Sequence, residues 1–341
     1  MCSGAKTGYK MTNELLYHIQ KEFPMSPKPF REIAKRFDMR EDEVISILQE
    51  EKAKGIIRQI SAIFDTKKLG YKSSLVAFKI DKNDIDKAAR ILNAHPGISH
   101  NYERDHDFNI WFTIAVDPDS RLGLDKTVEI LAKLTKAKEY IKLPTLKLFK
   151  IAVKLDTTGK NEKKEKVVKS KDIDIKLTPL HKKVIELAQN DIEIKSEPFR
   201  EIVEKLDIGY DTFFNILKEL KDSGMMRRYA AILNHRKAGF NANTMVVWGV
   251  DEDIAESEGK KAAAFSAVSH CYLRPKYPNW PYNLFTMIHG KTKDDTNGVI
   301  NSIAKEIQHN SYRPLYSTRE FKKVRVKYFT DESKKWEKQY I

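Results

Sequence analysis

The sequence predicts an α+β protein built by tandem duplication. Each copy is expected to hold an N-terminal helix-turn-helix followed by a ferredoxin-like β-α-β-β-α-β domain. The segment PFREI at 29–33 returns at 198–202, and the matching register then holds over more than forty residues, which is too long for chance. Within each copy the hydrophobic pattern changes from the helical period to the alternation of strands.

The duplication also locates an insertion. SHNY at 99–102 matches SHCY at 269–272 with an offset of 170, and FNI at 108–110 matches YNL at 282–284 with an offset of 174. The second copy therefore carries four additional residues within 275–281.

In the first copy, the pattern predicts helices at 14–22, 29–37 and 41–54, the last of them ended by Gly55. Strands are predicted at 56–64, 72–80, 98–104, 108–116 and 146–155, with helices at 84–93 and 122–139. The second copy repeats this order with helices at 180–189, 198–206 and 210–222 and a sheet between 245 and 327.

These elements define five segments. We expect helix-turn-helix domains at 10–57 and 177–226, and ferredoxin-like domains at 58–155 and 227–330. Between the copies, residues 156–176 contain seven Lys and five Asp or Glu with almost no large apolar side chain. Such a segment cannot bury enough apolar surface to order itself, so it is predicted to be a charged linker.

Composition restricts the class of protein. Of 341 residues, 62 are Lys or Arg and 48 are Asp or Glu, giving a net charge of +14 that favours anionic partners. No apolar run is long enough to span a membrane, and the two cysteines lie far apart, so we expect a cytoplasmic protein without disulfides. Phosphate-loop, CxxC and HExxH motifs are missing from the sequence, so we expect no metal bound by the protein alone.

Two matching triplets are the main candidates for chemistry. Residues i, i+2 and i+4 of a strand share one face, so the triplet at 100, 102 and 104 should point together, as should its equivalent in the second copy. Each triplet offers His, Tyr and Arg: a group that titrates near neutral pH beside a permanent cation. A solvated sheet face, or an interface between the copies, would explain the same pattern. The triplets are His100, Tyr102 and Arg104, and His270, Tyr272 and Arg274.

The architecture resembles the Lrp/AsnC family of transcriptional regulators. However, the predicted recognition helices carry net charges of −3 at 41–54 and −1 at 210–223, which does not suit a polyanion. The Arg that such regulators commonly place mid-helix is replaced by Ile47 and Ile216, which are better explained as core residues. We therefore expect no binding to nucleic acid.

A closer resemblance covers nearly the whole chain. RRYAAILNHRKAGF at 227–240 and SHCYLRP at 269–275 resemble the B subunit of siroheme decarboxylase, whereas HPGISHNYERDHDFNIWFTI at 95–114 resembles its A subunit. The resemblance implies a natural A–B fusion whose halves pair like a heterodimer, with further homo-oligomerisation open. It also implies removal of CO2 from the C12 and C18 acetates of siroheme, giving 12,18-didecarboxysiroheme for heme or heme d1 biosynthesis. No cofactor is then required, because the iron belongs to the substrate.

Under this hypothesis His100 and His270 are the candidate catalytic residues, and either one is a candidate axial ligand of the substrate iron. Arginines would anchor the substrate carboxylates, and Trp280 and Tyr282 would stack on the macrocycle, although Trp280 fits a core position equally well. The predicted substrate-binding residues are Arg58, Tyr102, Arg104, Arg227, Arg228, His235, Tyr272, Arg274, Trp280, Tyr282 and Asn283.

Two further histidines of the second copy have no counterpart in the first. His235 is replaced by Thr66 and His289 by Ala115. A turn position explains His235 without any function, and we expect His289 to be structural. Two other functions stay open at this point: a DNA-binding regulator that senses a tetrapyrrole or an amino acid, and a tetrapyrrole carrier without turnover.

Overall fold

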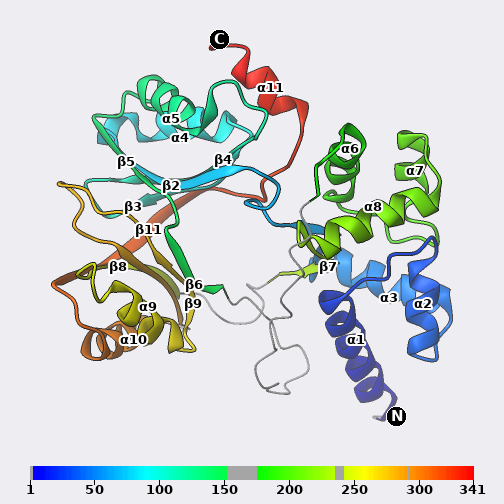
Figure 1. Cartoon of the computed structure of the whole chain (residues 1–341). Coiled ribbons are helices and arrows are strands. Elements are labelled where there is room, and N and C mark those ends of the chain that lie inside the picture. The colour runs from blue at the N-terminus through cyan, green and yellow to red at the C-terminus, as the bar shows by residue number, and fades with distance from the viewer. Residues whose placement is uncertain (1–2, 152–174, 235–241, 291) are drawn as a thin grey trace. The chain divides into compact units, whose positions relative to one another are not determined.

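A computed structural model describes residues 3–151, 175–234, 242–290 and 292–341 (Figure 1). The chain divides into two compact units. A helical unit comprises Met1–Gly70, Leu155–Lys237 and Lys327–Thr330, and a sheet unit comprises Tyr71–Lys154, Ala238–Val326 and Asp331–Ile341. The predicted linker at 156–176 lies almost entirely outside the described residues. Within the described part of the chain, no helix is long and apolar enough to cross a membrane.

The helical unit holds the two helix-turn-helix motifs, as predicted. The turn between the second and third helix of each motif contains an Asp with positive φ, Asp38 in the first copy and Asp207 in the second, both at 53°. Gly55 and Gly224, at φ of 70° and 73°, then end the third helix of each copy. The helices are α1 (Ser3–Lys21), α2 (Pro29–Arg36), α3 (Glu41–Ala53), α6 (Pro179–Ala188), α7 (Arg200–Leu206) and α8 (Tyr210–Asp222).

One strand of each copy also belongs to this unit. β1 (Ile57–Phe64) pairs antiparallel with β7 (Met226–Leu233) in a separate two-stranded sheet. The predicted boundaries after residues 57 and 226 assigned these strands to the ferredoxin-like domains. In the structure each strand finds its hydrogen-bonding partner in the other copy instead, so it is part of the helical unit.

In the sheet unit, each copy forms a ferredoxin-like sheet with the strand order 4-1-3-2. The first copy contributes β2 (Lys72–Lys79), β3 (Ile98–Arg104), β4 (Ile110–Val116) and β5 (Glu139–Leu143). The second contributes β8 (Ala242–Gly249), β9 (Val268–Leu273), β10 (Leu284–Gly290) and β11 (Ser311–Lys323). The α+β class and the duplication are confirmed.

The two sheets are joined by strands that pass from one copy to the other. Residues 311–316 of β11 pair with β8, whereas residues 317–323 pair with β3 of the first copy. In return, β6 (Lys147–Ile151) leaves the first copy and pairs with β9. The result is one nine-stranded sheet in the order β5-β2-β4-β3-β11-β8-β10-β9-β6.

The chain leading to β6 differs from the prediction. The helix expected at 122–139 ends earlier, because α5 (Gly123–Leu134) is followed by Lys136 with a positive φ of 56°. Residues 139–143 then form β5, a strand that was not predicted, because residue 139 had been assigned to the end of the helix and residues 140–143 to no element. Pro144 separates β5 from β6, since proline has no N–H for a sheet ladder.

Helices cover the outer faces of the two sheets (Figure 1). α4 (Ile85–Ala94) and α5 pack on the first sheet, and α9 (Ala255–Ala264) and α10 (Lys293–Glu306) pack on the second. The short helices η1 (Lys82–Asp84) and α11 (Asp331–Glu337) complete the sheet unit. Each of the helix pairs α4–α5 and α9–α10 forms an apolar cluster with its sheet. A further apolar cluster is shared by the two copies and consists of Ala77, Phe108, Trp111, Ile141, Leu143, Met245, Val247, Trp280, Phe285 and Leu315.

Candidate active site

Beside the apolar cluster shared by the copies, the sheet unit contains a cavity of about 580 Å³. Strands of both copies line it. A volume of this size suits a small-molecule ligand. Its lining includes His100, Tyr102, Arg104, Trp111 and Thr113 from the first copy, and Asn243, Met245, His270, Tyr272, Arg274, Phe285, Met287, His289, Glu320 and Lys323 from the second.

The two triplets predicted from strand alternation meet in this cavity. β3 presents the first triplet and β9 presents the second, and all six side chains line the same space. The copies also agree in detail: the rings of His100 and Tyr102 lie 6.2 Å apart at 28°, and those of His270 and Tyr272 lie 6.1 Å apart at 24°. Residues between them point the opposite way, as Asn101 does when it donates to Asn93 of α4.

Each triplet arginine reaches into the other copy. Arg104 donates through Nη1 to the carbonyl oxygen of Leu315 at 2.7 Å, and Arg274 donates through Nη1 to the carbonyl oxygen of Leu143. These acceptors are equivalent positions, because Leu315 pairs with Met245 of β8 and Leu143 pairs with the matching residue of β2. The arginines therefore connect the copies reciprocally.

Both arginines are buried cations without a carboxylate partner among the described residues. Arg104 is 7% exposed and Arg274 is 8% exposed, and the Nε of each finds no hydrogen-bond acceptor in that part of the chain. Burial lowers the pKa of each guanidinium to about 10, which leaves both charged at neutral pH. A buried cation with unused donors favours an anionic ligand, carboxylate above all.

Each triplet histidine is hydrogen-bonded to the serine that precedes it. His100 Nδ1 lies 3.0 Å from Ser99 Oγ, and His270 Nδ1 lies 2.8 Å from Ser269 Oγ. Nε2 is then the ring nitrogen left for a ligand. The serines precede the histidines in both copies of the sequence, but no function was inferred for them there.

Burial keeps both histidines neutral at neutral pH. It is the largest cause that lowers the pKa of His100, with Lys323 adding to the effect and Glu320 opposing it. Burial also lowers the pKa of His270 to about 4, with smaller contributions from His289 and His100. An anionic ligand would raise both values, because negative charge stabilises the imidazolium ion.

His289 lines the cavity. The sequence had predicted a structural role for this residue instead. Its Nε2 lies 2.5 Å from Ser269 Oγ, and its Nδ1 lies 2.5 Å from Oδ1 of Asn243. Strand alternation could have indicated that His289 faces the cavity, because residue 289 lies on the same face of β10 as Met287 and Phe285, which also line it.

Three predicted substrate-binding residues are placed differently. Trp280 is 1% exposed, and its ring packs among Phe108, Trp111 and Phe285, so it is a core residue with no face left for a macrocycle. Tyr282 packs half-buried against the same cluster. Asn283 bonds both the N–H and the C=O of Val250, at 3.0 and 2.9 Å, which makes it structural.

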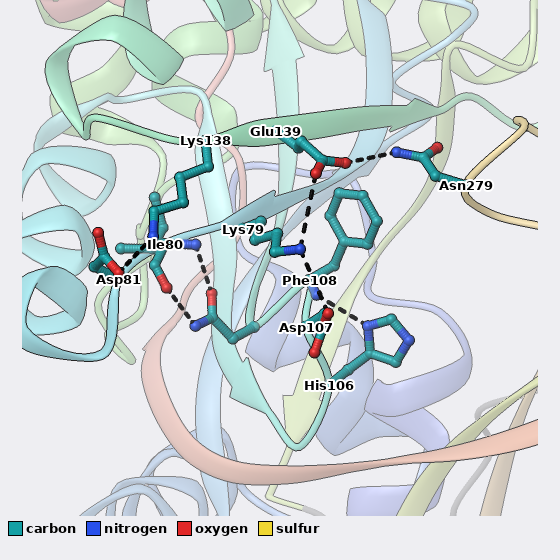
Figure 2. A network of polar contacts seen from close by, with 10 residues as sticks. Lys79, Ile80, Asp81, His106, Asp107, Phe108, Lys138, Glu139 and Asn279 are labelled. Atoms are coloured by element: carbon teal, nitrogen blue, oxygen red, sulfur yellow. Dashed lines mark hydrogen bonds and ion pairs between the residues drawn. The ribbon is translucent and has the colours of Figure 1, made fainter.

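The equivalent Asn109 makes the same pair of bonds to Ile80, at 2.9 and 2.7 Å. Figure 2 shows Ile80 within a polar network at this edge of the sheet unit. In the same network, Asn279 of the inserted segment donates to Glu139 of β5 at 2.7 Å. The insertion therefore fastens the second copy to the first.

Three of the remaining predicted residues, Arg58, Arg227 and Arg228, do not line the cavity. Arg58 lies exposed on β1, and Arg228 lies half-buried on β7. Arg227 forms an ion pair with Asp65 at 2.8 Å. His235 lies outside the described residues. Substrate binding by these four stays a prediction.

Comparisons with known proteins agree with this arrangement. A family model described as "AsnC-like ligand binding domain" matches residues 68–150 and 237–322, and a second, "Siroheme decarboxylase NirDL-like HTH domain", matches 13–58 and 181–227. A siroheme decarboxylase of Hydrogenobacter thermophilus is 39% identical over 96% of this chain and 98% of its own length. The chain belongs to the siroheme decarboxylase family.

Two other members of the siroheme decarboxylase family bear on the site and the duplication. One is the siroheme decarboxylase NirDL, whose crystal structure was solved in complex with an iron-uroporphyrin III analogue. Its fold matches the fold of this chain with a TM-score of 0.79 and a sequence identity of 34%, covering 96% of this chain and 98% of that one. The beta subunit of Methanosarcina barkeri is 41% identical over 42% of this chain and 95% of its own length. A separate subunit in that relative thus has the length of about one copy here.

Proposed function

We propose that this protein is a siroheme decarboxylase, a carboxy-lyase that removes CO2 from the C12 and C18 acetate side chains of siroheme to give 12,18-didecarboxysiroheme. The observation that carries the proposal is the cavity in the sheet unit, where two histidines and two buried arginines from different copies line one space. The family supports the same activity, and a relative of similar structure holds an iron tetrapyrrole analogue.

Binding would depend on Arg104 and Arg274. Siroheme carries several carboxylates, and a guanidinium can hold a carboxylate through parallel N–H donors. In each arginine Nη1 already donates to a carbonyl oxygen of the other copy, and this hydrogen bond fixes the plane of the guanidinium. The Nε of each is buried without an acceptor in the described chain, and a substrate carboxylate would supply one.

The reaction breaks the bond between the acetate methylene and its carboxylate. The electron pair left on the methylene carbon spreads into the conjugated macrocycle, CO2 departs, and a proton delivered to that carbon completes a methyl group. No electrons are gained or lost overall, so we propose that no cofactor beyond the substrate iron is needed. His100 and His270 are the candidate proton donors, because a substrate carboxylate beside either ring would raise its pKa towards neutrality.

The same chemistry argues against a regulator. α3 begins with Glu41, Asp42 and Glu43, which would face phosphates with negative charge if this helix entered a DNA groove. Ile216 of α8 is buried, as predicted, and Ile47 of α3 is partly buried, so neither offers a polar contact to bases. We infer that the helix-turn-helix motifs are retained as scaffold.

The deciding experiment is anaerobic incubation of the purified chain with siroheme, followed by mass analysis of the extracted tetrapyrrole. Two successive losses of CO2 are expected. His100→Ala and His270→Ala separate an enzyme from a carrier, since an enzyme loses product and a carrier loses at most affinity. Siroheme recovered unchanged from a tight complex would contradict the proposal and favour the carrier.

A further inference from the structure

The two triplet histidines sit in unequal surroundings. In the second copy a chain of side chains runs from Asn243 through His289 and Ser269 to His270, with links of 2.5, 2.5 and 2.8 Å. In the first copy His100 and Ser99 meet Thr113, whose hydroxyl lies 2.8 Å from the serine. Ala115 stands at the position equivalent to His289, so no imidazole contacts Ser99 from that position.

In this hydrogen-bonded series of side chains in the second copy, the donor and the acceptor of each link can be assigned. Oδ1 of Asn243 only accepts, so Nδ1 of His289 carries a proton and donates to it. The Nε2 of a neutral His289 then bears a lone pair and accepts from the hydroxyl of Ser269. The other acceptor for that hydroxyl, the carbonyl oxygen of Met287, lies at 3.4 Å and is the weaker partner. Ser269 in turn accepts from Nδ1–H of His270.

We propose that the chain Asn243–His289–Ser269 fixes His270 in the tautomer with its proton on Nδ1, so that Nε2 presents a lone pair to the iron of the bound tetrapyrrole. His289 and Ser269 are positioning residues in this assignment, which rests on the proposed function because siroheme supplies the iron. A histidine ligand to a metal is oriented in this way by the acceptor of its other ring N–H.

The first copy lacks such a constraint. Ser99 and Thr113 are both hydroxyls, and each can donate or accept. The Nδ1 of His100 therefore finds a partner in every protonation state of the ring, and the imidazolium form carries a second proton, on Nε2, that it can give to the substrate. The copies divide the work: His270 binds iron, and His100 donates the proton that replaces CO2.

The test is spectroscopic. Protein labelled with 15N-histidine is loaded anaerobically with ferric siroheme, and the coupling of an imidazole nitrogen to the iron is recorded by pulsed electron paramagnetic resonance. Affinity is measured in parallel for siroheme and for sirohydrochlorin, the same macrocycle without iron. The coupling is expected in the wild type and absent in His270→Ala.

The positioning residues should act on the iron form alone. His289→Ala and Ser269→Ala are each expected to weaken siroheme binding by about 10- to 100-fold, the usual effect of losing a partner of a metal ligand. Binding of sirohydrochlorin should be unchanged. His289→Gln, whose amide oxygen can accept from Ser269, should restore much of the affinity. Thr113→Val, the matched change in the first copy, should keep the wild-type coupling.

Several results would overturn the assignment. A coupling lost in His100→Ala and kept in His270→Ala would reverse the roles. An equal loss of affinity for both macrocycles in His289→Ala would reduce that residue to a structural one. A wild type that decarboxylates siroheme without imidazole coupling would refute this inference and leave the proposed function intact, whereas a wild type that neither binds nor converts siroheme would refute the function.

Discussion

Arg104 and Arg274 each donate to a main-chain carbonyl of the opposite copy, at the equivalent positions Leu315 and Leu143. Each guanidinium therefore takes this hydrogen-bond acceptor from the other copy, while the Tyr102 or Tyr272 ring of its own copy packs beside it. The cavity has its cations in position only when both copies are present, which explains why a duplicated chain, or a pair of subunits, is needed to build it.

Loss of either guanidinium should weaken siroheme binding more than it harms folding. Arg104→Met and Arg274→Met are each expected to raise the dissociation constant about 10- to 100-fold, because a charge-assisted hydrogen bond contributes about 1.5–3 kcal/mol. Lys at either position should rescue only partly, since it keeps the charge and loses the planar fork. Titration followed by absorbance measures the affinity.

The matched control is Arg319, which also lines the cavity. Its guanidinium is already paired with Glu103 and Asp86, and it is half-exposed. Arg319→Met should change affinity little. Weaker binding in that variant than in Arg104→Met would contradict the carboxylate-anchor role of the buried pair.

Asn283 and Asn109 should prove structural. Each closes a pair of hydrogen bonds with the backbone of a neighbouring strand end, at Val250 and Ile80 respectively. Asn283→Ala and Asn109→Ala leave a buried N–H and C=O without partners, so each should lower the free energy of unfolding by about 2–4 kcal/mol. Denaturant unfolding measures this. Siroheme affinity that fell only in Asn283→Ala would restore its predicted role in binding.

Mild acid should lower the stability of the sheet unit, because unfolding allows the buried, neutral His95 to take up a proton. This side chain is 5% exposed, accepts from Gly97 N–H at 3.0 Å and packs edge-on against Trp336. Burial is the main cause that lowers its pKa to about 3, from an ordinary value of 6.5, and Lys322 adds to it.

The unfolded chain therefore takes up this proton first. Stability due to neutral His95 is complete above pH 6.5 and is lost as the pH falls towards 3, with about 2 kcal/mol gone at pH 5. Denaturant unfolding at pH 7 and pH 5 measures the loss, and His95→Gln should show a shallower decline than the wild type. Parallel declines in the two proteins would show that other groups are responsible.

Much of this molecule follows from local sequence signals. The repeat of PFREI and the change of periodicity predicted the duplication and both folds, and strand alternation placed each His, Tyr and Arg of a triplet on one face. These signals lie within short segments and occur in both copies, so they can be read from the sequence without knowing which strands pair.

The exchange of strands between copies was not predictable in this way. Whether β6 pairs within its own copy or with β9 depends on contacts far apart in the sequence. For the same reason, the acceptors of Arg104 and Arg274 and the burial of Trp280 appear only in three dimensions. His289 lacked a counterpart in the first copy, so the repeat gave it no support, although alternation along β10 places it on the cavity face.

The exchanged strands predict that the fusion itself is dispensable. A chain divided between residues 156 and 176 and expressed as two fragments should yield a stable one-to-one complex, because β11 pairs with β3, β6 pairs with β9, and β1 pairs with β7. Size-exclusion chromatography with light scattering tests the complex, and siroheme turnover tests the site. The expected activity equals that of the intact chain. Fragments that fold but separate would mean that the ladders are too weak alone and that the covalent link supplies the effective concentration that holds the cavity together.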